Sequence, residues 1–356
     1  MSRIQIQYKK PLNVSGNLLK LFKPDNKYLN VNLGVRTLND VFVNHYGLVL
    51  KNGFLVKGCA PNIGISFYDK TALFKHWRKG LEQVVVSKYG KSIPFENWND
   101  DNQYLVIHSP WFSYYFWLTE CLPRLLRVKD KLDGLTLIYP ESWDNLSFVK
   151  ETLELFPGLK IRRLKKDVHL RVKNLLMPEV KPWTPMFIPE DVQLVRGLLF
   201  EAVEKKGVQS KYKTDKIYIT RRGAKRRKFD NEPKVEEILS QYGFQAVEME
   251  KLTFFEQIAL MKETKYMTAI TGAGLINILF MKKGGAFLDL TNEAYKTKKQ
   301  YSFHYFKLCN LLNIDYAVSF FKHINDDDVD HYSNQDLILD EQLLKTDIEL
   351  ILNGKN

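Results

Sequence analysis

The sequence predicts an α/β protein whose carboxyl-terminal part is a doubly wound, parallel-sheet domain. Three observations lead to this fold class. From about residue 207 onward, short apolar runs that suit buried strands alternate with helix-like segments. The turn Gly272-Ala273-Gly274 separates one such run from a helix and a further strand, which is the pattern of a β-α-β unit. The chain has 356 residues, 45% hydrophobic and 26% charged, so it is long enough for two ordinary globular domains.

The amino-terminal part is expected to be a separate α/β domain over residues 1–200, with an irregular, β-rich start. A hairpin over 47–56 is predicted to turn at Asn52-Gly53. Four prolines between 178 and 189 indicate a change of direction near the domain boundary. The elements expected before and after them are strands at 104–107, 135–139, 160–164 and 172–176 and helices at 114–126, 145–156 and 189–206.

The carboxyl-terminal domain is expected over residues 207–325. A helix at 333–354 is expected to follow it and to pack back on the amino-terminal domain. Thr253 and Glu256 have the spacing of a capping box at a helix start. The other expected elements are strands at 216–220, 244–249, 266–270, 285–290 and 315–320 and helices at 234–242, 275–281 and 302–312.

The net charge indicates which classes of binding partner to expect, and the cysteine content indicates the redox state of the compartment. The chain carries 53 Lys+Arg against 41 Asp+Glu, a net charge of +12, which favours nucleic acid, anionic lipid or a phosphorylated substrate. Its three cysteines are far apart and predict neither a zinc site nor a disulfide framework, as in a reducing compartment. We read the acidic run Asp326-Asp327-Asp328 with Asp330 as a solvated loop that caps the last helix, so we expect no metal site.

A basic block lies between residues 206 and 228, with ten Lys/Arg and one acid, Asp215. Arg221 and Arg227 follow a predicted strand and precede a predicted helix. Guanidinium groups there would suit a pyrophosphate, since they stay charged and make bidentate contacts. A solvated basic loop and a nucleic-acid or localisation patch are the alternatives. Charge alone leaves all three open.

The glycine turn at 272–274 is the second candidate ligand site. In a β-α-β unit it lies at the carboxyl end of a strand, where open α/β sheets bind ligands. Glycine lets the backbone come close to a ligand, and the following helix start offers N–H groups to a phosphate. An ordinary tight turn is the alternative. The turn, together with Asp289 at the end of the next strand, also weakly resembles the fingerprint of a dinucleotide-binding site. A nicotinamide-dependent oxidoreductase is therefore a competing function.

Glu120 and Arg124 are four residues apart on the aromatic-rich helix predicted at 114–126, so they share a face. Pro123 is expected to bend or restart this helix. The pair is either a surface ion pair of little energetic consequence or part of a functional site. In the second case, Glu120 lies among aromatic side chains that raise its pKa towards the range of a general base.

Taken together, these motifs resemble glycosyltransferase family 61. The resemblance rests on the joint order of five motifs, at 114–125, 217–222, 227–232, 255–257 and 272–277. It implies a GT-B-like fold, that is, two doubly wound α/β domains facing a cleft, and inversion at the anomeric carbon without a required metal or cofactor. It also implies a nucleotide-sugar donor, expected to be a UDP-sugar, and a glycan or lipid-linked acceptor in surface or capsular polysaccharide synthesis.

The resemblance also assigns roles to residues. It implies that the diphosphate is held by Arg221, Arg227, Gly272, Ala273 and Gly274. Asn231 and Glu232 would order the basic loop and Asn277 the glycine turn, while Glu120 and His108 are the candidate bases for the acceptor hydroxyl. A phosphate site is thereby favoured over nucleic acid. The expected location is cytoplasmic, with peripheral contact to the inner face of the membrane.

The sequence departs from the family pattern at two positions. The family commonly has His where this chain has Phe116, and again where it has Thr271. If either imidazole acts in relatives, its role has moved or been lost here. A catalytically inactive relative that only binds sugar nucleotide is therefore an alternative.

Overall fold

The computed structural model describes residues 8–22, 32–52, 54–60, 95–109, 111–166, 168–182, 186–297, 303–324 and 335–354. The chain divides into two compact units. The amino-terminal unit is Lys27–Val195, and the carboxyl-terminal unit combines Met1–Asn26 with Arg196–Asn356. The division falls within helix α5 (Pro189–Lys205). Both units contain helices and parallel strands, so the α/β class predicted from the sequence is confirmed.

The amino-terminal unit has a mixed sheet of eight strands among its described residues. Its order is β3 (Phe54–Leu55), β2 (Val49–Lys51), β1 (Val35–Asn44), β8 (His169–Pro178), β5 (Gln103–Leu105), β6 (Leu135–Pro140) and β7 (Lys160–Leu164), with β4 (Phe95–Trp98) also paired to β8. Strands β8, β5, β6 and β7 are parallel neighbours, whereas β1 is antiparallel to β8 and to β2. Only this part of the sheet is parallel, whereas we expected a doubly wound, parallel sheet for the whole domain.

The helix predicted at 114–126 is interrupted by a wider turn. It consists of α2 (Tyr114–Phe116), a π-helical turn (Trp117–Cys121) and α3 (Leu122–Leu126). Pro123 cannot donate a backbone hydrogen bond to the preceding turn, and its ring crowds that turn. This explains why the helix widens before Pro123. After the helix, the chain continues through β6, α4 (Ser147–Leu153) and β7.

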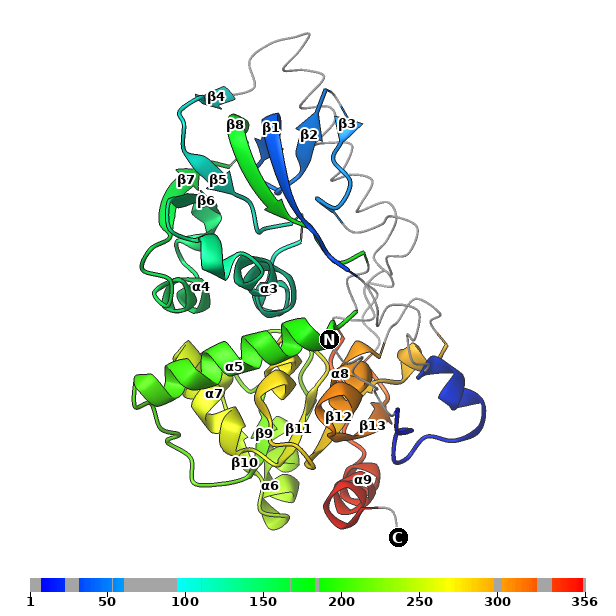
Figure 1. Cartoon of the computed structure of the whole chain (residues 1–356). Coiled ribbons are helices and arrows are strands. Elements are labelled where there is room, and N and C mark those ends of the chain that lie inside the picture. Colours follow the sequence, from blue (N-terminus) through cyan, green and yellow to red (C-terminus); the bar gives the residue numbers. More distant parts are fainter. Residues whose placement is uncertain are drawn as a thin grey trace. The chain divides into compact units, whose positions relative to one another are not determined.

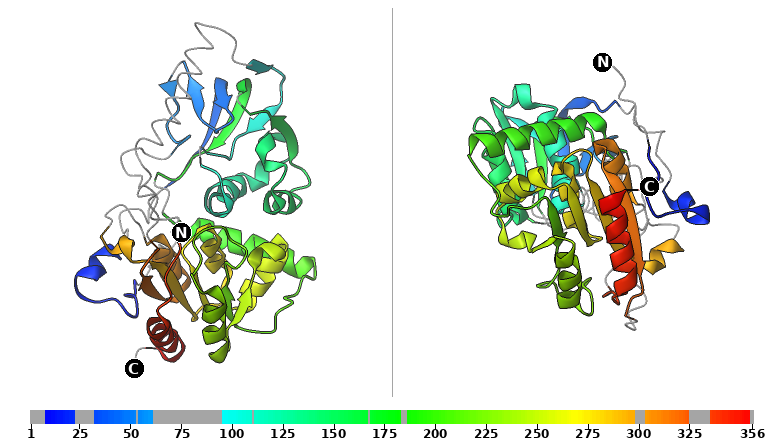
Figure 2. Two further views of the ribbon diagram at one scale, coloured as in Figure 1. Left: turned by 180° about the vertical axis from the view of Figure 1, so that it is seen from behind. Right: turned by 90° about the horizontal axis from the view of Figure 1, so that it is seen from below.

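The carboxyl-terminal unit contains a five-stranded, wholly parallel sheet (Figure 1). The order is β10 (Gln245–Val247), β9 (Lys216–Ile219), β11 (Tyr266–Ile270), β12 (Ala286–Asn292) and β13 (Asp315–Phe321). Helices cover both faces, as Figure 2 also shows. They are α6 (Glu232–Gln241), α7 (Phe254–Glu263), a 3₁₀ helix (Ala273–Phe280), α8 (His304–Leu312) and α9 (Glu341–Asn353). The doubly wound arrangement predicted for this part is therefore present.

Segments from both ends of the chain pack in the carboxyl-terminal unit. Helix α9 packs on β12, β13 and α6 there, because Leu344, Ile348 and Ile351 share the core of that sheet. Its expected packing on the amino-terminal domain stays a prediction. Near the amino terminus, the ring of Phe22 lies 4.3 Å from that of Phe303 between centroids. Residues 8–22 therefore belong with the carboxyl-terminal unit, whereas we expected them in the amino-terminal domain.

Candidate functional site

Strands β9 and β11 form the switch point of the parallel sheet. They are neighbours, yet the chain leaves β9 for β10 at one edge and leaves β11 for β12 on the other side. Loops that follow such a pair of strands diverge over opposite faces and leave a crevice at the carboxyl ends, where open α/β sheets bind ligands. One loop, 220–231, contains the end of the predicted basic block 206–228. The other, 271–272, leads into the predicted glycine turn 272–274.

Arg221 and Arg227 both turn towards Gly272. A Cβ atom placed on Gly272 would lie 3.7 Å from the Nη1 atom of each arginine. Gly272 has a φ of −179°, an extended conformation that any residue can adopt. The glycine is therefore not required by its backbone angles. It keeps the space in front of the two guanidinium groups free of a side chain, and we call this arrangement of Arg221, Arg227 and Gly272 the arginine cradle.

The two arginines of the cradle bring two positive charges close together. Among the described residues, no carboxylate forms an ion pair with either of them. Arg221 donates from Nη2 to the carbonyl of Arg226 at 3.1 Å, while its Nε is buried without a partner. Burial and the nearby Arg227 lower the pKa of Arg221. Arg227 has a φ of +57°, which costs a non-glycine residue of order 1 kcal/mol. An anion would relieve this repulsion.

Glu232 holds the basic loop in place. Its buried carboxylate accepts hydrogen bonds from the Tyr218 hydroxyl at 2.6 Å, the Thr220 hydroxyl at 2.8 Å, the Arg221 N–H at 3.0 Å and the Phe229 N–H at 3.2 Å. The adjacent Asn231 caps α6 by accepting from the N–H of Lys234 at 3.3 Å. The loop is thus fixed at both ends, as a preorganised site needs, although the binding roles themselves stay predictions.

Tyr305 is a member of the site that sequence reasoning missed. Its hydroxyl donates to the carbonyl of Gly272 at 2.7 Å and so fixes the glycine turn from α8. No signal in the sequence links a tyrosine at 305 to a glycine at 272. Asn277, for which we predicted a similar role, is buried and donates to Gln257 of α7 at 3.2 Å. Ala273 and Gly274 are exposed at the start of the 3₁₀ helix.

Asp289, beside the glycine turn, is an internal carboxyl group. It is 1% exposed and accepts hydrogen bonds from the hydroxyl of Thr271 and from that of Tyr316, the latter at 2.8 Å. Burial raises its pKa to about 7, and the two hydroxyls offset part of that rise. Since Asp289 is enclosed, it is not placed to take ribose hydroxyls as a dinucleotide fingerprint requires.

Two other cations of the basic block, Arg222 and Lys211, form ion pairs with carboxylates. Arg222 is exposed and forms an ion pair with Glu236 on α6. Lys211 pairs with Glu256 at 2.8 Å. These pairs are solvated and contribute little to stability. Because Arg222 is already neutralised, it is a natural control for Arg227.

Glu120 lies in the π-helical turn of the amino-terminal unit and is only 2% exposed. Its Oε2 accepts from the Ser109 hydroxyl at 2.9 Å, and Oε1 has no hydrogen-bond partner. Burial raises its pKa, and Lys181, Ser109 and Arg124 offset part of the rise. The alternative of a surface ion pair is wrong, because Arg124 is also buried, at 1% exposure.

His108 is close in the chain but differs in its chemistry. Burial, with Arg124 nearby, lowers the pKa of the imidazole to about 3, so it remains neutral. Its carbonyl accepts from Arg124 Nη1 at 2.9 Å, and the carbonyl of Pro178 accepts from Arg124 Nε at 2.8 Å. Arg124 therefore ties the segment that follows β5 to the last residue of the neighbouring strand β8.

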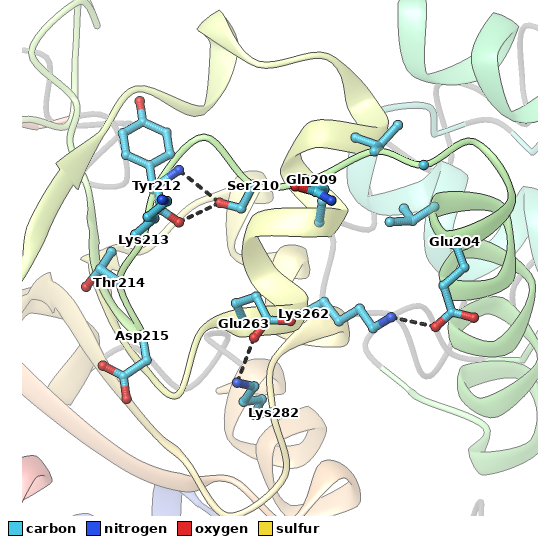
Figure 3. Close-up of a pocket in the computed structure, with 14 residues that line it drawn as sticks. Glu204, Gln209, Ser210, Tyr212, Lys213, Thr214, Asp215, Lys262, Glu263 and Lys282 are labelled. Atoms are coloured by element: carbon cyan, nitrogen blue, oxygen red, sulfur yellow. Dashed lines mark hydrogen bonds and ion pairs between the residues drawn. The ribbon is translucent and has the colours of Figure 1, made fainter.

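A cavity of about 670 Å³ lies at the opposite, amino-terminal edge of the parallel sheet (Figure 3). It is lined by residues that precede the strands, including Asp215 before β9. Two of its three lysines, Lys262 and Lys282, are paired with Glu204 at 2.6 Å and Glu263 at 2.9 Å, and Lys213 is the third. No arginine lines this cavity, so the arginine cradle remains our candidate anion site.

Two further searches concern the described residues only. Among them, no group of three or more His, Cys, Asp or Glu side chains is arranged to hold a metal ion. The acidic run at 326–330 lies outside the described residues. Within the described part of the chain, none of the helices combines the length and apolar character needed to cross a bilayer.

Arginines at the switch point of a parallel α/β sheet are an arrangement that many phosphate-binding proteins share. The comparison with protein families is more specific. Residues 114–288 match the family Glycosyltransferase 61, a span that includes the π-helical turn, the basic loop and the glycine turn. This match supports assignment of the chain to glycosyltransferase family 61, a family whose activity implies a donor and an acceptor substrate. A search of curated proteins finds no significant match.

Proposed function

We propose that the protein transfers a sugar from a nucleotide-sugar donor, a UDP-sugar, to a glycan or lipid-linked acceptor. We further propose that the transfer inverts the anomeric carbon without a metal and serves surface or capsular polysaccharide synthesis. The observation that carries the proposal is the arginine cradle: Arg221 and Arg227 each lie 3.7 Å from the Cβ position of Gly272, at the carboxyl ends of β9 and β11.

The cradle meets the main chemical demand of such a reaction. When the bond between the anomeric carbon and the diphosphate breaks, its electron pair goes to a phosphate oxygen. Preorganised cations and N–H donors stabilise this charge best where they need not rearrange. Arg221 and Arg227 supply the cations, and the open start of the 3₁₀ helix at Ala273 and Gly274 supplies N–H groups.

The acceptor hydroxyl also needs a base, and Glu120 suits this role better than His108. Its Oε1 has no protein partner, and it is the only one of the two groups that carries negative charge when ionised. His108, with a pKa of about 3, is a weak base. Because Glu120 is 2% exposed, neighbouring side chains must move before an acceptor reaches it.

The finer features of the assignment are proposals of the same kind. They are the GT-B-like pair of domains, a hexosyl or pentosyl donor, and a cytoplasmic location peripheral to the membrane. The net charge of +12 supports contact with an anionic surface. The inactive, sugar-nucleotide-binding alternative is supported by Thr271, whose hydroxyl is engaged by the internal Asp289. Binding without turnover would distinguish it.

The test compares Arg227→Ala with Arg222→Ala in the full chain. UDP-, GDP- and CMP-sugars and NAD(P) are screened by thermal shift, and nucleoside diphosphate release is then followed with the sugar that stabilises most. Arg227→Ala should lower release by orders of magnitude, because a cation at the leaving group is lost. Arg222→Ala should retain release, since Arg222 already pairs with Glu236. Equal release in both variants would remove Arg227 from the site. A thermal shift with NAD(P) alone, or steeply salt-dependent binding of DNA or RNA, would favour the other functions.

A further inference from the structure

Ser109 is a buried serine that directly contacts Glu120 and has no role in the function proposed so far. It is 3% exposed, and its hydroxyl donates to Oε2 of Glu120 at 2.9 Å. The other carboxyl oxygen, Oε1, is buried and has no hydrogen-bond partner among the described residues. An ionised carboxylate accepts at both oxygens, and buried polar atoms are rarely left unpaired. The contact with Ser109 therefore makes the two oxygens of Glu120 chemically different.

The segment that carries Ser109 is held in place by three backbone contacts. It follows β5, and the N–H of Val106 donates to a carbonyl of β8 at 3.2 Å. The carbonyl of His108 accepts from Nη1 of Arg124 at 2.9 Å. A Cβ atom placed on Gly47 would lie 2.2 Å from the carbonyl oxygen of His108, so these two backbones are in close contact. The hydroxyl of Ser109 is thus presented from a fixed segment, as a positioning group needs.

The Ser109 hydroxyl has two possible acceptors but only one proton. Besides Oε2 of Glu120 at 2.9 Å, the carbonyl oxygen of Trp111 lies 3.3 Å from Oγ. A hydroxyl donates to one acceptor at a time, and an ionised carboxylate is the stronger acceptor. Ser109 therefore donates to Glu120 when the carboxyl group is ionised. The carbonyl of Trp111 is the alternative acceptor when that group is neutral.

We propose that Ser109 is a positioning residue for Glu120: its hydroxyl occupies Oε2 and leaves Oε1 as the oxygen that takes the proton of the acceptor. The inference rests on the proposed role of Glu120 as the base. In the step, the O–H bond of the acceptor breaks, its proton goes to Oε1, and the acceptor oxygen bonds to the anomeric carbon. The bond from that carbon to the diphosphate breaks, and its electron pair goes to a phosphate oxygen. Ser109 keeps its own proton throughout.

The groups around Glu120 agree with this assignment. Burial raises the pKa of Glu120, and Lys181, Ser109 and Arg124 offset part of the rise, in that order. Among the described residues, Ser109 is the one of these three that donates a hydrogen bond to the carboxyl group. Burial raises the pKa of the neighbouring Cys121 thiol, which therefore adds no charge. A hydrogen bond to the ionised form favours that form, so the loss of the Ser109 hydroxyl should favour the neutral carboxyl group.

The experiment titrates Glu120 directly in the full chain. Infrared difference spectra of wild type against Glu120→Gln identify its carboxyl stretch, and the midpoint of that band is then measured in Ser109→Ala and Ser109→Thr. Alanine removes the donor, whereas threonine retains it. Ser109→Ala should raise the midpoint by about one pH unit, and Ser109→Thr should stay near wild type. If Ser109→Thr does not fold, Ser109→Cys replaces it, and its weak S–H donor should give a midpoint between those of wild type and Ser109→Ala.

Ser319→Ala is the matched control, because Ser319 is also a buried serine that donates to a buried carboxylate, at 2.6 Å to Oδ2 of Asp347 in the carboxyl-terminal unit. Release of nucleoside diphosphate, with the sugar chosen by thermal shift, should fall about tenfold in Ser109→Ala. Its acid limb should move to higher pH with the Glu120 midpoint, while affinity for the diphosphate stays unchanged. Ser319→Ala should keep both the rate and the pH profile.

The outcomes separate this inference from the proposed function. An unshifted Glu120 midpoint in Ser109→Ala, with Glu120→Gln inactive, overturns the role of Ser109 alone. A fall in release that is equal in Ser109→Ala and Ser319→Ala, without a shifted acid limb, reduces Ser109 to a structural role and also overturns the inference. Turnover retained in Glu120→Gln overturns the base assignment itself and the role of Ser109 with it.

Discussion

The two units place arginines near the carboxyl ends of parallel strands, but these arginines make different contacts. Arg124, in the amino-terminal unit, is 1% exposed and donates to the backbone carbonyls of His108 and Pro178. Arg221 and Arg227, in the carboxyl-terminal unit, are partly exposed and face a glycine without a counter-ion among the described residues. An arginine whose guanidinium N–H groups donate to backbone carbonyls stabilises the fold. When two arginines lie together and their guanidinium N–H groups have few protein partners, those N–H groups are available to a ligand.

The largest expected effect tests the structural half of this contrast. Arg124→Met should lower the free energy of unfolding by about 3–5 kcal/mol, because it leaves two buried carbonyls unpaired and removes a positive charge near Glu120. Arg227→Met should change it by less than about 1 kcal/mol. Urea denaturation followed by circular dichroism measures both. A loss of similar size in the two variants would end the distinction between them.

The fold of the carboxyl-terminal unit could be predicted because its strands and helices alternate and each has a local signal. Thr253 and Glu256, for example, form the capping box that their spacing predicts. The amino-terminal sheet was harder, since β1 and β8 pair in antiparallel fashion between residues such as Val35 and Pro178. When two strands that pair lie so far apart in the sequence, neither segment contains a pattern that identifies its partner. Similarly, the spacing of apolar residues in α9 predicts that one face of the helix is buried, but it does not predict which sheet covers that face.

The candidate site could also be predicted only in part: its location followed from the predicted strands, but its detailed contacts did not. Arg221 and Gly272 each follow a predicted strand, and adjacent parallel strands bring their carboxyl ends together. Which of the neighbouring arginines points to the glycine is decided by contacts: Glu236 takes Arg222, whereas Arg227 bends back through a left-handed φ. The π-helical turn around Glu120 and the contact from Tyr305 depend on tertiary packing and have no local signature.

A smaller effect should sharpen the ligand-binding half of the contrast. In Gly272→Ala the new Cβ lies at ordinary contact distance from Arg221 and Arg227, so the fold is kept while the space for an anion is filled. Affinity for UDP should fall about tenfold or more, close to 1.4 kcal/mol. Gly197→Ala in helix α5 is the matched control, since no heavy atom lies within 4 Å of its Cβ position and the residue has no role in the cradle. Isothermal titration calorimetry gives both affinities, and equal values would place the anion elsewhere.

The third comparison concerns carboxyl groups, and its effect on stability within one pH unit is small. Glu120 is buried with Lys181 and Arg124 as its opposite charges, whereas the pKa of Asp289 is influenced by burial and two hydroxyls. Burial raises the pKa of Asp289 from 3.8 to about 7. Between these values the unfolded chain binds fewer protons than the folded one, so stability falls as pH rises, by at most about 1.4 kcal/mol per pH unit.

Asp289→Asn should therefore flatten the dependence of unfolding free energy on pH between about 4 and 7, because the variant has no proton to lose at this position. Asparagine retains an oxygen that can accept from Thr271, so the glycine turn should keep its geometry. Urea titrations at intervals of half a pH unit compare the two slopes. If wild type and variant lose stability in parallel, Asp289 is already ionised in the fold. It would then have a compensating cation, as Glu120 does, and the contrast between the two carboxyl groups would disappear.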